Sequence, residues 1–92
     1  MDAVRLLLLD QRDNIAVAIA DLHAGDVASL DRDEITLRND VARGHKVALR
    51  RLAVGDDIIR YGEAVGAASA AIEVGEHVHV HNVLSKRLPG RS

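Results

Sequence analysis

The 92-residue chain contains no Cys, Phe or Trp, and Tyr61 is its single residue of the large aromatic types. Without Cys, neither a disulfide framework nor thiolate chemistry is available, and a reducing, cytoplasmic setting is expected. Without large aromatic side chains, the chain lacks the platforms on which single-stranded nucleic acid stacks its bases. The core must therefore be built from Val, Ile, Leu and Ala.

The chain also lacks an excess of charge of either sign and a long apolar run. Its formal net charge is -2, and its Lys and Arg residues are scattered among Asp and Glu. No broad basic surface is available, so nucleic acid is not an expected partner. The four leucines at 6–9 fall far short of a membrane span or of the usual signal-peptide apolar region. The length fits one small domain.

Glycine marks a recurring pattern: an apolar residue is followed by Gly three positions later and by another apolar residue three positions after the Gly. The copies are "VARGHKV" (41–47), "LAVGDDI" (52–58) and "IEVGEHV" (72–78), with a looser copy, "LHAGDV", at 22–27. Glycine suits a turn with positive φ, and the apolar residue after it begins a strand. The irregular spacing of the copies argues against a solenoid.

This pattern predicts a mostly β domain of short strands and hairpins over residues 1–85, with at most one short helical turn. The predicted strands are 4–9, 15–19, 27–30, 35–38, 45–49, 57–61, 64–70 and 76–83. Asp13 and Asn14, just before the second strand, are expected to form an Asx-type turn. Residues 86–92, which include the single proline, are expected to form a flexible tail or the stub of a linker.

The segment "EHVHVHN" (76–82) places three of the five histidines at alternate positions. In a strand, His77, His79 and His81 would share one face, while Val78 and Val80 would point to the other, buried face. Imidazoles spaced in this way can converge on a divalent cation such as Fe²⁺ or Mn²⁺. The alternative is a solvated strand face that tolerates His.

A second polar group lies in "GHKVALR" (44–50), where Arg43, His45 and Lys46 cluster positive charge around a Gly turn. Such a cluster could receive a carboxylate. A turn whose polar side chains are only solvated is the competing interpretation. His23 stands alone in a turn, and no role is assigned to it.

Three segments, "DNIAVAIADLHAGD", "ITLRNDVARGHKVALRRLAVGDDIIRYGEAVGAA" and "GEHVHVHN", together resemble the SAF domain of the altronate and galactarate dehydratase family. The resemblance extends from about residue 6 to residue 83. The segments "TLRNDVARGHKVAL" and "GEHVHVHN" look closer to altronate dehydratase, and the small subunit of sulfolactate sulfo-lyase is similar too. The resemblance implies a β-clip fold. It also implies a role in a metal-dependent lyase that removes water, or sulfite, from a hydroxy acid.

For a sugar-acid dehydratase, the resemblance implies a large partner subunit and a divalent metal, Fe²⁺ or Mn²⁺, shared with that partner. The chain alone is then expected to be inactive, whether it is a small subunit or a fragment. The expected metal ligands are His77, His79 and His81, of which His79 and His81 could also transfer protons. Expected substrate-binding residues are His45, Lys46 and Asn82. Arg60 stands where relatives commonly carry Lys.

Two further interpretations stay open. One is the small subunit of a sulfolactate sulfo-lyase, which belongs to the same broad enzyme class. The other is a non-catalytic β-clip module that binds carbohydrate or protein. The sequence does not decide whether the chain forms a homo-oligomer.

Overall fold

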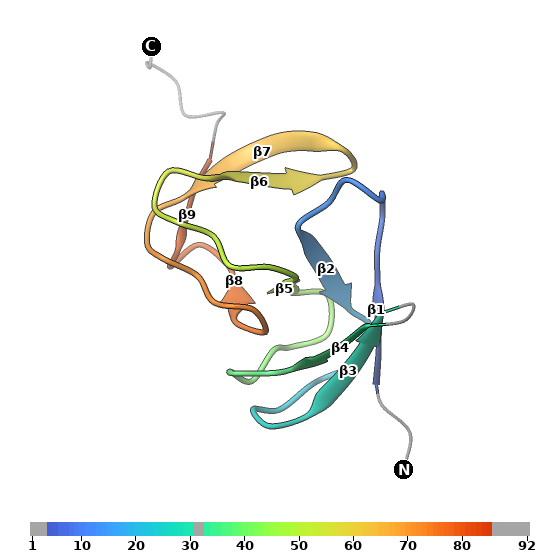
Figure 1. The fold of residues 1–92 in the computed structure, drawn as a ribbon. Helices are drawn as coiled ribbons and strands as arrows, with labels where there is room; N and C mark the ends of the chain where they lie inside the picture. The colour runs from blue at the N-terminus through green and yellow to red at the C-terminus, as the bar shows by residue number, and fades with distance from the viewer. Residues whose placement is uncertain (1–3, 31–32, 86–92) are drawn as a thin grey trace.

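The computed structural model describes residues 4–30 and 33–85, which form a mostly β fold (Figure 1). The strands are β1 (Val4–Leu7), β2 (Ile15–Ala18), β3 (Val27–Leu30), β4 (Asp33–Thr36), β5 (Lys46–Ala48), β6 (Asp57–Arg60), β7 (Glu63–Ala68), β8 (His77–Val78) and β9 (Val83–Ser85). The predicted fold class is confirmed, and the described residues contain no helical turn. Accordingly, they include no helix that is long and apolar enough to cross a membrane. The predicted tail, 86–92, lies outside the described residues.

The strands form two sheets. The larger has the order β4-β3-β1-β2-β5-β8, and the smaller has the order β6-β7-β9. Only the pairing of β1 with β3 is parallel among the described strand pairs. In Figure 1 the smaller sheet lies at the top and β3 and β4 lie at the bottom, with β2 and β5 between them. The chain therefore folds around a central β2–β5 pair.

Most predicted strands are present, but the one predicted over 76–83 is wrong. Only β8 pairs with β5 there, and the residues from His79 to Asn82 form a turn before β9 begins. The backbone N–H of Asn82 donates to the carbonyl of His79 and closes this turn. The alternation of His and Val fits a strand, but a strand also needs a partner along its whole length. A smaller correction concerns β4, which begins two residues earlier than predicted.

The recurring Gly pattern forms four equivalent turns. Their glycines, Gly25, Gly44, Gly55 and Gly75, have φ between +86° and +92°. In every copy the residue after the glycine donates its backbone N–H to the carbonyl three residues earlier. A side chain at such φ values is strained, so glycine is the residue that closes these turns without a penalty. The pattern found in the sequence is thus a repeated turn.

The four turns pair off and divide the fold into two halves. Leu22 bridges to Val41 in the first half, and Leu52 bridges to Ile72 in the second. Each bridge joins the apolar residues that begin two copies of the pattern. The irregularly spaced copies therefore meet in two pairs and do not form a linear stack of repeats.

Each half has its own small apolar core, and the β2–β5 pair separates the two. Ala16 and Val47 are buried in the first core, whereas their neighbours Ile15 and Ala48 are buried in the second. Successive side chains of a strand point to opposite faces, so these two short strands contribute to both cores at once. Both faces of the central pair consequently pack against a core, although Val17 and Lys46 remain partly exposed.

Two buried polar side chains tie the second half to β2. Asn14 accepts the backbone N–H of Ile59 and donates to the carbonyl of Asp57, at 2.8 Å each. Asp13 accepts the backbone N–H groups of Tyr61 and Gly62 in the β6–β7 hairpin. The expected Asx-type turn is therefore wrong, because both side chains bond across more than 40 residues. Buried side-chain acceptors are stable only when paired, and the hairpin supplies the donors.

Candidate metal centre

The pairing of β5 with β8 creates a histidine cluster. Lys46 lies opposite Val78 and Val47 opposite His77, in an antiparallel register. The same register continued by one residue places His45 against His79. Their rings stack with centroids 4.4 Å apart. Strand pairing thus gathers histidines that are separated by more than 30 positions in the chain.

Three imidazoles converge within this cluster. Nδ1 of His45 lies 2.9 Å from Nε2 of His77, and one ring nitrogen from each of His45, His77 and His79 lies within 4.8 Å of the others. The ring of His81 is 5.3 Å from that of His77, centroid to centroid, and is tilted by 39°. Two of the three predicted ligands therefore meet, with His45 as the third member, while His81 lies beside them. We call His45, His77 and His79 the histidine trio.

A buried amide shapes the turn that carries the trio. Asn82 is 3% exposed, and its Nδ2 donates to the carbonyl of His77 while its Oδ1 accepts the backbone N–H of His79. The backbone N–H of His77 donates to Oδ1 of Asn39. Asn82, a predicted substrate-binding residue, thus uses both polar atoms of its side chain on the backbone around His77 and His79. It fixes the backbone from which the side chains of His77 and His79 project.

The residue His45 occupies a position that serves another purpose in the other three turns. There the residue after glycine is acidic, and its carboxylate accepts a backbone N–H three residues earlier, at 2.8 Å for each of Asp26, Asp56 and Glu76. In the turn at Gly44 the corresponding side chain is an imidazole that stacks on the other histidines. This departure from the pattern is the sequence signal that marks His45 as a candidate functional residue, although it does not indicate which residues His45 meets.

Two hollows adjoin the trio, and their linings differ: one is polar and the other is mostly aliphatic. His45 and His77 line a depression of about 400 Å³ that also includes Asp21, His23 and Asp40. One oxygen of each aspartate accepts a backbone N–H, from Arg43 and Ala24 respectively. His23, to which the sequence assigned no role, is thus part of this polar depression.

Lys46 lies on the other side of β5 from His45, because adjacent residues in a strand face opposite ways. It lines a groove of about 220 Å³ together with Arg60 and His79. Burial, followed by the charge of Arg60, lowers the pKa of Lys46. The predicted substrate-binding pair His45 and Lys46 therefore faces two separate hollows.

The valines of the histidine segment do not share one buried face. Val78 is 3% exposed and belongs to the second core, whereas Val80 is 81% exposed at the tip of the turn. The prediction that both are buried is wrong for Val80, because the chain leaves the strand at His79.

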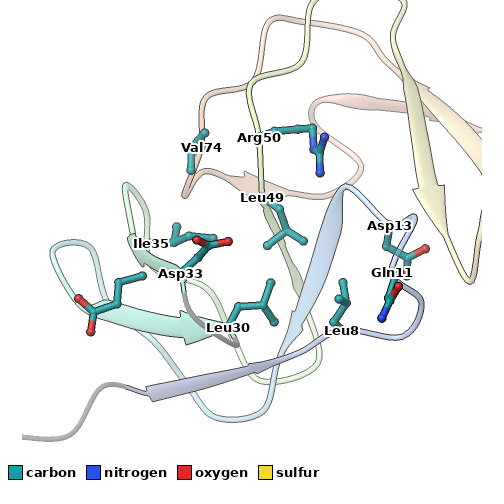
Figure 2. Close-up of a pocket in the computed structure, with 10 residues that line it drawn as sticks. Leu8, Gln11, Asp13, Leu30, Asp33, Ile35, Leu49, Arg50 and Val74 are labelled. Atoms are coloured by element: carbon teal, nitrogen blue, oxygen red, sulfur yellow. The ribbon is translucent and has the colours of Figure 1, made fainter.

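A third hollow, of about 370 Å³, lies away from the histidines (Figure 2). Its walls come from the β1–β2 connection, from β3 and β4, and from Leu49, Arg50 and Val74. Asp13 also lines it, but that carboxylate already accepts two backbone N–H groups of the β6–β7 hairpin. The cavity carries no imidazole, and its mixed lining gives no chemistry comparable to that of the trio.

Two ring nitrogens of the trio have the spacing of neighbouring metal ligands. Two nitrogens at neighbouring positions around a metal with bonds of about 2.1 Å lie roughly 3 Å apart. The 2.9 Å between the ring nitrogens of His45 and His77 has this spacing. Burial, followed by the charges of His45, His79 and His81, lowers the pKa of His77. The neutral imidazole that binds metals is thereby favoured at His77.

The fold and the site together define a class of protein: a mostly β module that presents a histidine cluster at the edge of a sheet. The sequence model of the altronate/galactarate dehydratase SAF domain matches residues 4–86. The chain therefore belongs to this family of SAF domains.

Two relatives illustrate the range of the family. Altronate dehydratase of Escherichia coli K12 is 54% identical over 70 residues, which are 76% of this chain and 14% of that protein. The alpha subunit of (2R)-sulfolactate sulfo-lyase from Chromohalobacter salexigens is 32% identical in an alignment 92 positions long, which covers 92% of this chain and 98% of that subunit. The chain thus spans a small part of the dehydratase but nearly the whole alpha subunit.

Proposed function

We propose that this chain is the SAF module of a metal-dependent sugar-acid dehydratase and acts together with a larger polypeptide. The observation that carries the proposal is the convergence of His45, His77 and His79. The relationship to altronate dehydratase supports the reaction class, and the 14% coverage of that protein supports the need for a larger partner.

The histidine trio would hold the metal, and the remaining ligands would come from the partner. A set of imidazoles suits Fe²⁺ better than Mn²⁺, which prefers oxygen ligands. When bound, the metal would supply Lewis-acid stabilisation of the negative charge that develops next to the substrate carboxylate. The chain's own contribution is to preorganise three imidazole nitrogens where β8 pairs with β5.

Residues near the trio can bind and protonate a hydroxy acid. In the polar depression, Asp21 and Asp40 each offer a carboxylate to substrate hydroxyl groups. His81 is exposed beside His77 and outside the trio, so its imidazole is free to donate a proton to the departing hydroxyl. Of the two predicted proton-transfer residues, we therefore assign this role to His81 and ligation to His79.

The proposal is tested with a chimera of the Escherichia coli altronate dehydratase in which the 70 matched residues are replaced by this chain. We expect metal-dependent loss of water from altronate, and none from the chain alone. The His45→Ala chimera should lose both metal and turnover, whereas His81→Ala should keep its metal and lose turnover. A folded chimera that lacks metal and activity, beside an active parent enzyme, would refute the proposal.

A sulfolactate sulfo-lyase subunit is the second candidate, favoured by one observation. The alignment with the Chromohalobacter salexigens alpha subunit covers 98% of that subunit, so this chain contains the counterpart of nearly all of it. In this case the chain, mixed with the partner subunit of that lyase, would release sulfite from sulfolactate. Sulfite release without loss of water from altronate in the chimera would decide for this candidate.

A further inference from the structure

The groove beside Lys46 is the second built surface next to the trio. Six aliphatic side chains line it, together with Lys46, Arg60 and His79. Two of the aliphatic residues are largely open to solvent, since Val65 is 41% and Val80 is 81% exposed. These exposed apolar side chains lie beside the groove, and covering them with a partner would be favourable in free energy.

The two cations of the groove are unpaired within the part of the chain that the structure describes, although Glu63 lies opposite Arg60 in the β6–β7 register. Neither Lys46 nor Arg60 forms an ion pair with a described residue, and Nε of Arg60 is buried without a hydrogen-bond partner among them. The guanidinium of Arg60 lies 5.6 Å from the ring centre of Tyr61, which does not neutralise its charge. A partly buried, unpaired cation is costly, and a carboxylate would remove that cost.

The lining decides what kind of molecule brings the carboxylate. A sugar acid carries hydroxyl groups, and the six aliphatic side chains would leave those groups without hydrogen bonds. The residues after β9 include Lys86 and Arg87, whose positive charges Lys46 and Arg60 would repel. A polypeptide segment with aliphatic side chains around an Asp or Glu matches both the apolar lining and the charge.

We propose that this groove docks such a segment of the larger catalytic polypeptide, with its carboxylate bound by Lys46 and Arg60. The inference rests on the proposed function in one respect, namely that a larger polypeptide completes the site. Since His79 lines the groove and belongs to the trio, the docked segment would cover one side of the trio and leave the polar depression beside His45 and His77 for the substrate.

The docking is tested on the metal-free full chain with blocked tripeptides, by following backbone amide resonances in NMR titrations. Acetyl-Val-Glu-Val-amide should shift the resonances of Lys46, Arg60, Val65 and Val80 with a saturable dissociation constant on the order of millimolar. The Gln analogue of the peptide should bind about fivefold or more weakly, because it lacks the charge.

Matched variants locate the contact. Arg60→Gln and Val80→Ser should each weaken binding of the Glu peptide about fivefold or more. Arg50→Gln, in the hollow of Figure 2, and Val54→Ser, at an exposed site that is 67% accessible, should leave it unchanged. Because no metal and no turnover are involved, failure of the metal proposal would leave these results interpretable.

Three results would overturn the inference. The first is the absence of saturable shifts in the groove, or equal binding of the Glu and Gln peptides. The second is tighter binding of galactarate than of the peptide at these same residues, which would make the groove a substrate pocket. The third is a concentration-dependent shift of the groove resonances in the chain alone, which would identify a second copy as the occupant.

Discussion

The imidazole of His45 lies 2.9 Å from that of His77, between Nδ1 and Nε2, although 32 positions separate the two residues in the chain. At this distance one neutral imidazole donates a hydrogen bond to the other. A cation that displaces the shared proton would find both nitrogens at ligand spacing. The pair is therefore both a structural contact and the nucleus of the proposed metal centre.

Removing a member of the trio should weaken metal binding without unfolding the chain. We expect His45→Ala to lower the affinity for Fe²⁺ by at least about tenfold, since loss even of an outer partner of a ligand costs about 10- to 100-fold. Anaerobic isothermal titration calorimetry measures the effect, and amide NMR spectra verify the fold. His23→Ala is the matched control, because His23 lies in the neighbouring depression and outside the trio. Equal losses in both variants would contradict the assignment.

Removing the buried amide that shapes the turn should destabilise the fold. Asn82→Ala leaves the carbonyl of His77 and the N–H of His79 without their partner, so we expect a loss of about 1–3 kcal/mol in the free energy of unfolding. Urea denaturation monitored by circular dichroism measures this loss. Asn39→Ala, at an exposed position with a single bond to the backbone of His77, should cost less. A larger effect at Asn39 would show that the bond from the backbone of His77 to Asn39 stabilises the turn more than the two bonds of Asn82 do.

The two valines of the histidine segment should respond in opposite ways to truncation. Val78→Ala removes two methyl groups from the second core and should cost about 2 kcal/mol of unfolding free energy. Val80→Ala alters an exposed side chain and should change that free energy by less than about 0.5 kcal/mol. Paired denaturation curves of the two variants provide the measurement. A comparable loss in both would mean that the chain continues as a strand beyond His79.

The pH dependence of stability should reflect the lowered pKa of His77. Its ordinary value is 6.5, and burial, followed by the neighbouring histidines, lowers it in the folded chain. The unfolded chain therefore binds more protons than the folded chain as the pH falls below 6.5, and the free energy of unfolding decreases there. The stability present above this pH is lost as the pH falls through the folded pKa. Denaturation of the metal-free chain between about pH 7 and about pH 5 measures the slope, which His77→Gln should reduce. An unchanged slope would place the titration elsewhere.

The sequence by itself determined the class of the fold and the location of its turns. The Gly pattern predicts turns at Gly44 and Gly55 because positive φ is a local requirement of one residue and its neighbours. The short apolar runs between these turns predict strands, since the side-chain period of two is also a local property. The histidine segment 76–82 is likewise visible as a row of candidate ligands.

Only the tertiary structure decided where that row bends and which residue joins it. Local alternation favours a strand through Val80, but pairing ends at Val78 because β5, its partner, is only three residues long. The pairing of β5 with β8 brings His45 to His79. Because His45 is not a carboxylate that bonds to the backbone of its own turn, as Asp56 is, its side chain can stack on the other histidines. Register between distant strands arises from the packing of two cores on the central pair, and this interaction has no signature within a short stretch of sequence.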